Sequence, residues 1–105
     1  MKNRSGKQET VSEALDRLHA SGYDHDFVAE PAGLRDRMTG EVFAPEGMRV
    51  DEIVRFEGAT DPGDEAIVFA LRDAASTVRG TLSTAYGPNM GSAEVDILQR
   101  LPPAN

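Results

Sequence analysis

Three strand-like runs that follow one another at short spacing constrain the fold of this chain more than any other feature. They are residues 49–57 (RVDEIVRFE), 65–72 (EAIVFALR) and 78–86 (VRGTLSTAY). No more than seven residues separate one run from the next, whereas a parallel crossover connection needs about a dozen or more. We therefore expect the three runs to form an antiparallel β-meander.

The side-chain pattern of each run predicts its place in that sheet. Residues 65–72 are apolar at both alternating sets of positions, as is typical of a strand that is covered on both faces. Residues 49–57 alternate instead, which predicts a half-buried strand whose inner face is formed by Val50, Val54 and Phe56. The polar positions of the outer two runs are expected on one wet face, with the members Arg55, Glu57, Arg79, Thr81 and Ser83.

A helix is expected on either side of the strands. Residues 10–23 carry a one-sided apolar stripe, and Thr10 with Glu13 has the spacing of a capping box. Residues 92–101 form a second amphipathic segment with Ser92 as its expected N-cap. Shorter strand-like runs lie between, at 25–30, 34–38 and 41–43.

These elements predict an α+β fold. We expect an antiparallel β-meander of four to five strands, with an N-terminal and a C-terminal helix packed on one face. Residues 1–9 are interpreted as a disordered basic tail and residues 10–105 as a single domain.

Charge and composition exclude several classes of function. The net charge is −7, and beyond Lys2, Arg4 and Lys7 the chain holds 8 basic and 18 acidic residues, so its body repels a phosphate backbone. We expect no nucleic-acid partner. Without an apolar run of membrane-spanning length or an apolar leader, we expect no membrane association and a cytoplasmic location. The absence of cysteine excludes disulfides, thiolate metal sites and a cysteine nucleophile.

The loop between the first two strong runs is rich in carboxylates. Asp61, Asp64 and Glu65 supply oxygen ligands of the kind that calcium or magnesium prefers, but their spacing does not match a calcium-binding loop. Pro62-Gly63 has the composition of a type II turn, so we favour a hairpin tip with these acids as a weak candidate site. His19, His25 and their neighbouring acids could likewise be metal ligands, yet ordinary boundary histidines are favoured. We therefore expect no metal and no cofactor.

Several short motifs occur in order along residues 10 to 101, namely Arg55-Phe56-Glu57-Gly58, Asp61-Pro62-Gly63-Asp64-Glu65, Gly80-Thr81-Leu82 and Ala85-Tyr86-Gly87. Together they resemble a group of short, uncharacterised bacterial proteins that are often labelled phosphoribosylpyrophosphate synthetase. In that group an aromatic residue often precedes the Arg-Phe pair and an acid or amide the Ala-Tyr-Gly motif, where this chain has Val54 and Thr84. The usual phosphoribosyl-binding signature has two acids after an apolar strand, whereas Asp64 and Glu65 precede one. The resemblance therefore implies a family but no activity.

No complete enzyme motif is present, so the sequence favours a non-catalytic binding or regulatory module. Such a module would present a sheet face or edge to a protein partner or to a second copy of the chain. The alternative is a small enzyme or carrier that acts on a phosphorylated sugar or nucleotide. For either function the candidate ligand or partner surface consists of Arg55, Glu57, Arg79 and Tyr86. No catalytic residue is assigned, and whether the chain is an enzyme stays open.

Overall fold

The computed structural model describes residues 9–56, 65–75, 77–85 and 90–103 of the chain. Within them the elements follow in the order α1 (Val11–Ala20), β1 (His25–Glu30), β2 (Gly33–Asp36), β3 (Val42–Phe43), a single 3₁₀ turn η1 (Pro45–Gly47), β4 (Met48–Phe56), β5 (Ala66–Asp73), β6 (Arg79–Ala85) and α2 (Ser92–Arg100). None of the helices described is long and apolar enough to cross a lipid bilayer. Of the tail 1–9, which was expected to be disordered, residues 1–8 lie outside the described residues, whereas Glu9 is described and pairs with Arg17.

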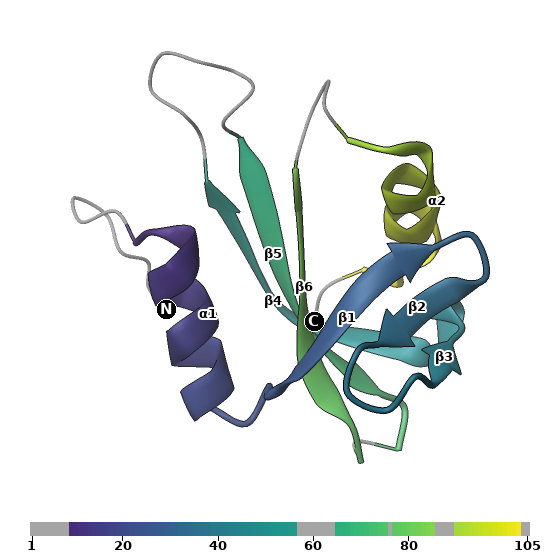
Figure 1. Cartoon of the computed structure of the whole chain (residues 1–105), viewed down its shortest axis with the longest axis horizontal. Helices are drawn as coiled ribbons and strands as arrows, with labels where there is room; N and C mark the ends of the chain where they lie inside the picture. The colour runs from purple at the N-terminus through teal and green to yellow at the C-terminus, as the bar shows by residue number, and fades with distance from the viewer. Residues whose placement is uncertain (1–8, 57–64, 76, 86–89, 104–105) are drawn as a thin grey trace.

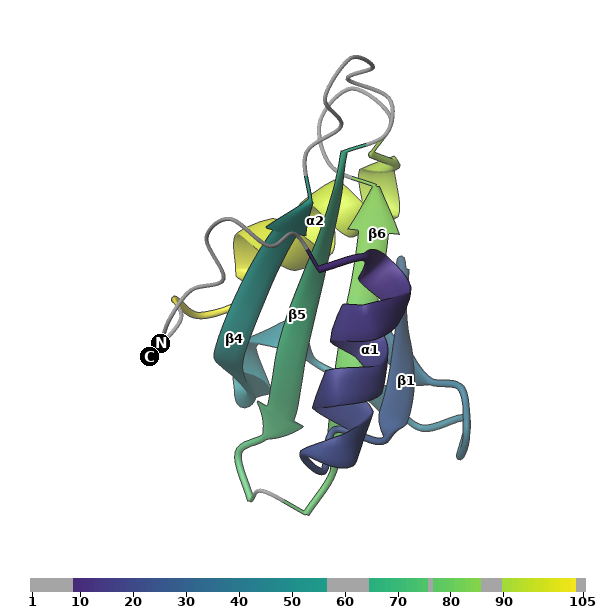
Figure 2. The same ribbon diagram turned by 90° about the vertical axis from the view of Figure 1, so that its left-hand side faces the viewer.

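The strands form one mixed sheet with the order β3-β2-β1-β6-β5-β4 (Figure 1). Strands β4, β5 and β6 pair antiparallel in sequence order, which confirms the expected meander. Strands β1, β2 and β3 form a second antiparallel unit, and β1 joins it to the meander by pairing parallel with β6. The two helices lie on opposite sides of this sheet, as Figures 1 and 2 both show.

The α+β class is as expected, but three details of the predicted architecture differ. Within the described residues the sheet has six strands instead of four to five and contains one parallel pair, and α1 and α2 cover different faces. The short spacing between strands limits only how consecutive strands pair, and β1 and β6 are far apart in the chain. Because β5 is apolar on both faces, the sequence pattern does not indicate which face of the sheet each helix covers.

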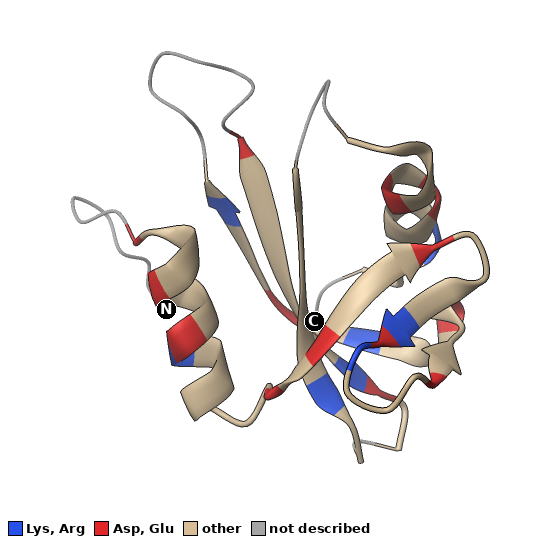
Figure 3. Cartoon of the chain, in the orientation of Figure 1, with Lys and Arg blue, Asp and Glu red and all other residues tan. Residues whose placement is uncertain are grey.

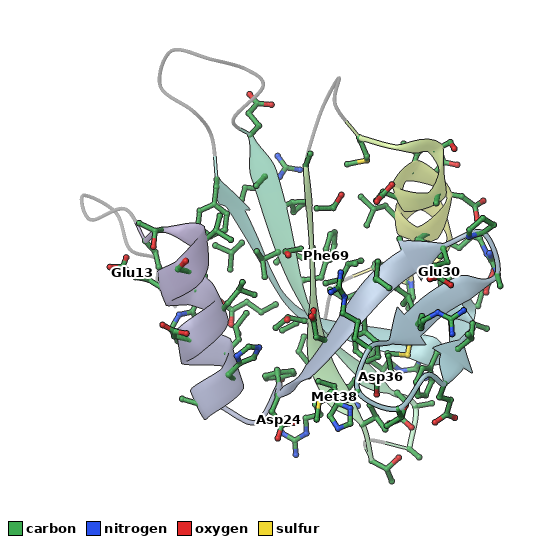
Figure 4. All side chains as sticks on the ribbon, in the orientation of Figure 1. Glu13, Asp24, Glu30, Asp36, Met38 and Phe69 are labelled. Carbon is green, nitrogen blue, oxygen red and sulfur yellow. The ribbon has the colours of Figure 1, made fainter. Side chains whose placement is uncertain are left out.

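The core accordingly consists of two clusters separated by the sheet. On the α2 side, Ile97 packs with the larger cluster, whose β5 members are Ile67, Phe69 and Leu71. On the α1 side, Leu18 packs with Val68 and Ala70 of the same strand. Phe69, labelled in Figure 4, lies in the middle of the sheet and is 6% exposed. The prediction that residues 65–72 are covered on both faces is confirmed.

A β-bulge divides β4 into two halves, and the alternation of side chains between the two faces of the sheet is reversed from one half to the other. Val50 pairs with Leu71 and Glu52 pairs with Ala70, so Asp51 is the extra residue. Val50 therefore belongs to the α2-side cluster, whereas Val54 and Phe56 pack on the α1 side. The expectation that these three residues share a face is wrong, because an inserted residue reverses the alternation of a strand.

The structure also tests the N-caps that were predicted for the two helices. Thr10 Oγ1 accepts a hydrogen bond from the Glu13 N–H at 3.0 Å, and Glu13 Oε1 accepts one from the Thr10 N–H at 2.9 Å. This reciprocal pair is the predicted capping box. The second helix starts at Ser92 with Gly91 as its N-cap, so Ser92 is the first helical residue and not the cap.

Gly80 sets how closely β1 approaches β6. A Cβ atom at Gly80 would lie 2.5 Å from the carbonyl oxygen of His25, its partner in the parallel pairing. Only glycine leaves room for two backbones at this distance. The contact brings β1, and with it His25 and Phe27, against the meander.

Candidate functional site

Three arginines lie directly opposite one another on neighbouring strands of the meander. Arg49 of β4 pairs with Arg72 of β5, and Arg72 pairs with Arg79 of β6. Directly opposite residues point to the same side of a sheet, and Arg72 follows Leu71, which packs on the α2 side. The three side chains, called the arginine row below, therefore lie on the α1 side. They occupy the end of the sheet near the β5–β6 connection, where basic residues are coloured blue in Figure 3.

Asp51 and Tyr23 complete this cluster. Arg72 Nε donates to both carboxylate oxygens of Asp51, at 2.9 and 3.0 Å. The Tyr23 hydroxyl donates to Asp51 Oδ2 at 2.6 Å. Arg79 lies over the Tyr23 ring, with its guanidinium carbon 5.9 Å from the ring centroid, which is within cation–π range. The bulge in β4 places Asp51 where it can receive both donors.

The electrostatics of the cluster keep Tyr23 protonated. Burial and the neighbouring Asp51 carboxylate both disfavour a tyrosinate, and together they raise the pKa of Tyr23 to about 12. The positive charges of Arg79 and Arg72 oppose this shift without cancelling it. At neutral pH the cluster therefore contains three guanidinium cations, one carboxylate and a neutral phenol. These charges give it a net charge of +2 in a chain whose total is −7.

A second polar group lies along α1. Arg17 Nε donates to Glu9 Oε2 at 2.8 Å, and Arg17 Nη2 lies 3.0 Å from Glu52 Oε2. The hydrogen bonds that Arg17 donates to Glu9 and Glu52 raise the pKa of Arg17 above its already high value. This group connects α1 to β4, so its charged side chains hold the helix against the sheet.

A third polar group joins β1 to β2 on the other face. His25 Nδ1 lies 2.6 Å from Oδ2 of Asp36, and Asp36 Oδ1 accepts a hydrogen bond from the Met38 N–H at 2.9 Å. Asp36 is fully buried, whereas the His25 side chain is 23% exposed. Burial by itself would raise the pKa of Asp36. The hydrogen bonds from Met38 and His25 and the electrostatic attraction of His25 outweigh that effect and lower it.

The described part of the chain does not bring the expected surface residues onto one face. Arg55 is exposed and pairs with Ile67, so it lies on the α2 side, whereas Arg79 lies on the α1 side. Glu57 and Tyr86 lie outside the described residues. Thr81, also expected on the wet face, is buried and pairs with Ala70 on the α1 side.

The acidic loop lies mostly outside the described residues as well. Asp61 and Asp64 are not among them, and Glu65 is half-buried just before β5. His19 is exposed on α1, whereas His25 turns toward Asp36. Within the described ranges, no three histidine or acidic side chains gather in an arrangement that could hold a metal ion.

Besides the arginine row, the edge of β4 is a second surface that could bind a partner. Among the described strands, β4 pairs with β5 alone. Beyond the bulge, Ile53 pairs with Phe69 and is 43% exposed, and Arg55 lies two positions further on the same face. Other large exposed apolar side chains are Met38, Val42 and Val95. Val42 lies on β3, at the opposite edge of the sheet.

Sequence reasoning named Arg79 but missed Arg49, Arg72, Asp51 and Tyr23. Arg49 and Arg72 lie at the ends of strands that were predicted correctly. Knowing the exact pairing register would therefore have found the arginine row. The bulge at Asp51 has no comparable signal in a single sequence.

Comparisons with known proteins add no functional information. No family model matches the chain, and neither a curated protein nor a solved structure matches it.

Proposed function

We propose that this chain is a small non-catalytic binding module that presents the open edge of β4 to a protein partner, in the first instance a second copy of itself. The observation that carries the proposal is the long edge strand with Ile53 exposed on it. An exposed strand edge has unpaired backbone N–H and C=O groups, which a further strand can bind.

The bulge restricts this pairing to the second half of the strand. Bulges near sheet edges disrupt the ladder, so the regular residues 52–56 form the usable part. A two-fold axis pairs a strand with its own copy in the antiparallel direction. Centred on Val54, such a pair sets Ile53 opposite Arg55 of the second copy. The aliphatic part of the arginine then covers the exposed isoleucine.

The test compares lysine substitutions at three exposed apolar positions. Ile53→Lys places a charge on the β4 edge, Val42→Lys places one on the opposite edge, and Val95→Lys places one on α2. Size-exclusion chromatography with light scattering then reports the mass of each variant over a range of concentrations. We expect a dimer for the wild type, Val42→Lys and Val95→Lys, and a monomer for Ile53→Lys, because an edge lysine opposes strand addition.

Two outcomes contradict the proposal. One is a wild-type chain that stays monomeric at every concentration. The other is a dimer that persists in Ile53→Lys or that dissociates equally in Val42→Lys. Circular dichroism of each variant shows that the fold is kept, since all three positions are at least a third exposed.

A further inference from the structure

We infer that the arginine row, with Tyr23 beside it, is a binding site for the phosphate group of a small phosphorylated ligand. The site is formed by Arg49, Arg72 and Arg79 on the α1 side of the sheet. It is independent of the β4 edge contact proposed above, because Arg55 and Ile53 face the α2 side.

The positive charges of the arginine row destabilise the fold unless negative groups balance them. Like charges directly opposite each other on neighbouring strands are destabilising, and here two such pairs share Arg72. Asp51 binds the middle guanidinium, so the four charged side chains retain an excess of two positive charges. A phosphate dianion supplies the two negative charges that balance this excess.

The geometry suits a phosphate more than a metal or an apolar group. Neighbouring strands are about 4.8 Å apart, so the outer two arginines start about 10 Å apart on either side of Arg72. Arg49 and Arg79 are both exposed. Their side chains can turn toward a ligand above the middle strand, and guanidinium groups bind phosphate oxygens through paired hydrogen bonds.

Asp51 and Tyr23 organise this site instead of blocking it. Asp51 holds the Arg72 Nε, which fixes the plane of that guanidinium. The Tyr23 ring lies under Arg79, and its hydroxyl points to Asp51. Two of the three arginines are thus oriented by neighbours before a ligand arrives, and preorganisation lowers the entropic cost of binding.

Titration calorimetry with inorganic phosphate and with pyrophosphate tests the site, with sodium chloride at equal ionic strength as the blank. The variants are Arg49→Gln and Arg79→Gln, and the matched control is Arg37→Gln. Arg37 is also exposed and carries the same charge, but its ion pair is with Asp26 at 3.6 Å. We expect saturable binding by the wild type and by Arg37→Gln. Each row variant should weaken it by about tenfold, the typical effect of losing a charge-assisted hydrogen bond.

Nuclear magnetic resonance locates the binding independently of the variants. Pyrophosphate should shift the backbone amides of residues 49, 72 and 79 together, and those near Arg37 should not move. The inference is overturned if neither probe binds the wild type. It is also overturned if Arg37→Gln weakens binding as much as the row variants, or if the shifted amides lie elsewhere. Because the assay reads ligand binding and not mass, its failure leaves the β4 edge proposal untouched.

Discussion

Replacing Gly80 by alanine should selectively weaken the contact between β1 and β6. The new Cβ atom would lie 2.5 Å from the carbonyl oxygen, 2.7 Å from the carbonyl carbon and 2.8 Å from the Cβ of His25. Two of these three atoms belong to the backbone, so no side-chain rotation relieves the clash. Strand β1 must move away from β6 at the first residue of their parallel pairing.

The expected cost follows from two opposing effects. Overpacking of this kind typically costs about 1–3 kcal/mol. Alanine also lowers the conformational entropy of the unfolded chain, which stabilises the folded state by about 0.4–1 kcal/mol. The midpoints of these two ranges differ by about 1.3 kcal/mol, so we expect the free energy of unfolding to fall by about that amount. For a domain of about this size, each kcal/mol lowers the melting temperature by about 4–8 °C.

The same substitution at Gly47 is the matched control. No atom lies within 4 Å of a Cβ built at Gly47, so Gly47→Ala should leave stability unchanged or raise it slightly. Urea denaturation followed by circular dichroism measures both variants. If Gly80→Ala is as stable as Gly47→Ala, the close approach of β1 to β6 is refuted, and the parallel pairing with it.

Three further substitutions test the polar contacts. Because its pKa is lowered in the folded state, Asp36 stabilises the fold above its ordinary pKa, and this contribution is lost as the pH falls through the lower, folded value. Urea titrations at about pH 7 and about pH 3 should show this loss in the wild type, and Asp36→Asn should lack it; equal pH dependence would contradict the assignment. An absorbance titration should show one tyrosine ionising near pH 12, and Tyr23→Phe should abolish that step; a step that survives belongs elsewhere. Thr10→Ala removes the capping box and should cost about 1 kcal/mol in urea denaturation, whereas no loss would show that the cap contributes nothing.

The elements that the sequence predicted well depend on neighbours along the chain. Thr10 and Glu13 are three residues apart, and their hydrogen bonds join groups within the first turn of one helix. The apolar positions on both sides of residues 65–72 likewise predicted a strand that is buried on both faces of the sheet. Short connections then left the antiparallel meander as the only way to pair the three strong strands.

The candidate site could not be predicted in the same way. The arginine row exists because the register sets Arg49, Arg72 and Arg79 opposite one another. Register is decided by how whole strands pack, and a shift of one residue would move side chains to the other face. The prediction joined Arg55 and Arg79 on one wet face, because a bulge cannot be read from alternation alone.

By itself, then, the sequence determined the class of the fold, the meander and the first helix cap, since these follow from short-range spacing and hydrogen bonding. Only the tertiary structure decided that β1 pairs parallel with β6, that the helices lie on opposite faces, and that the bulge at Asp51 reverses β4. The physical reason is that these features arise where segments distant in the chain meet. There, backbone approach at Gly80 and burial on both sides of β5 select one arrangement among several that the sequence pattern allows.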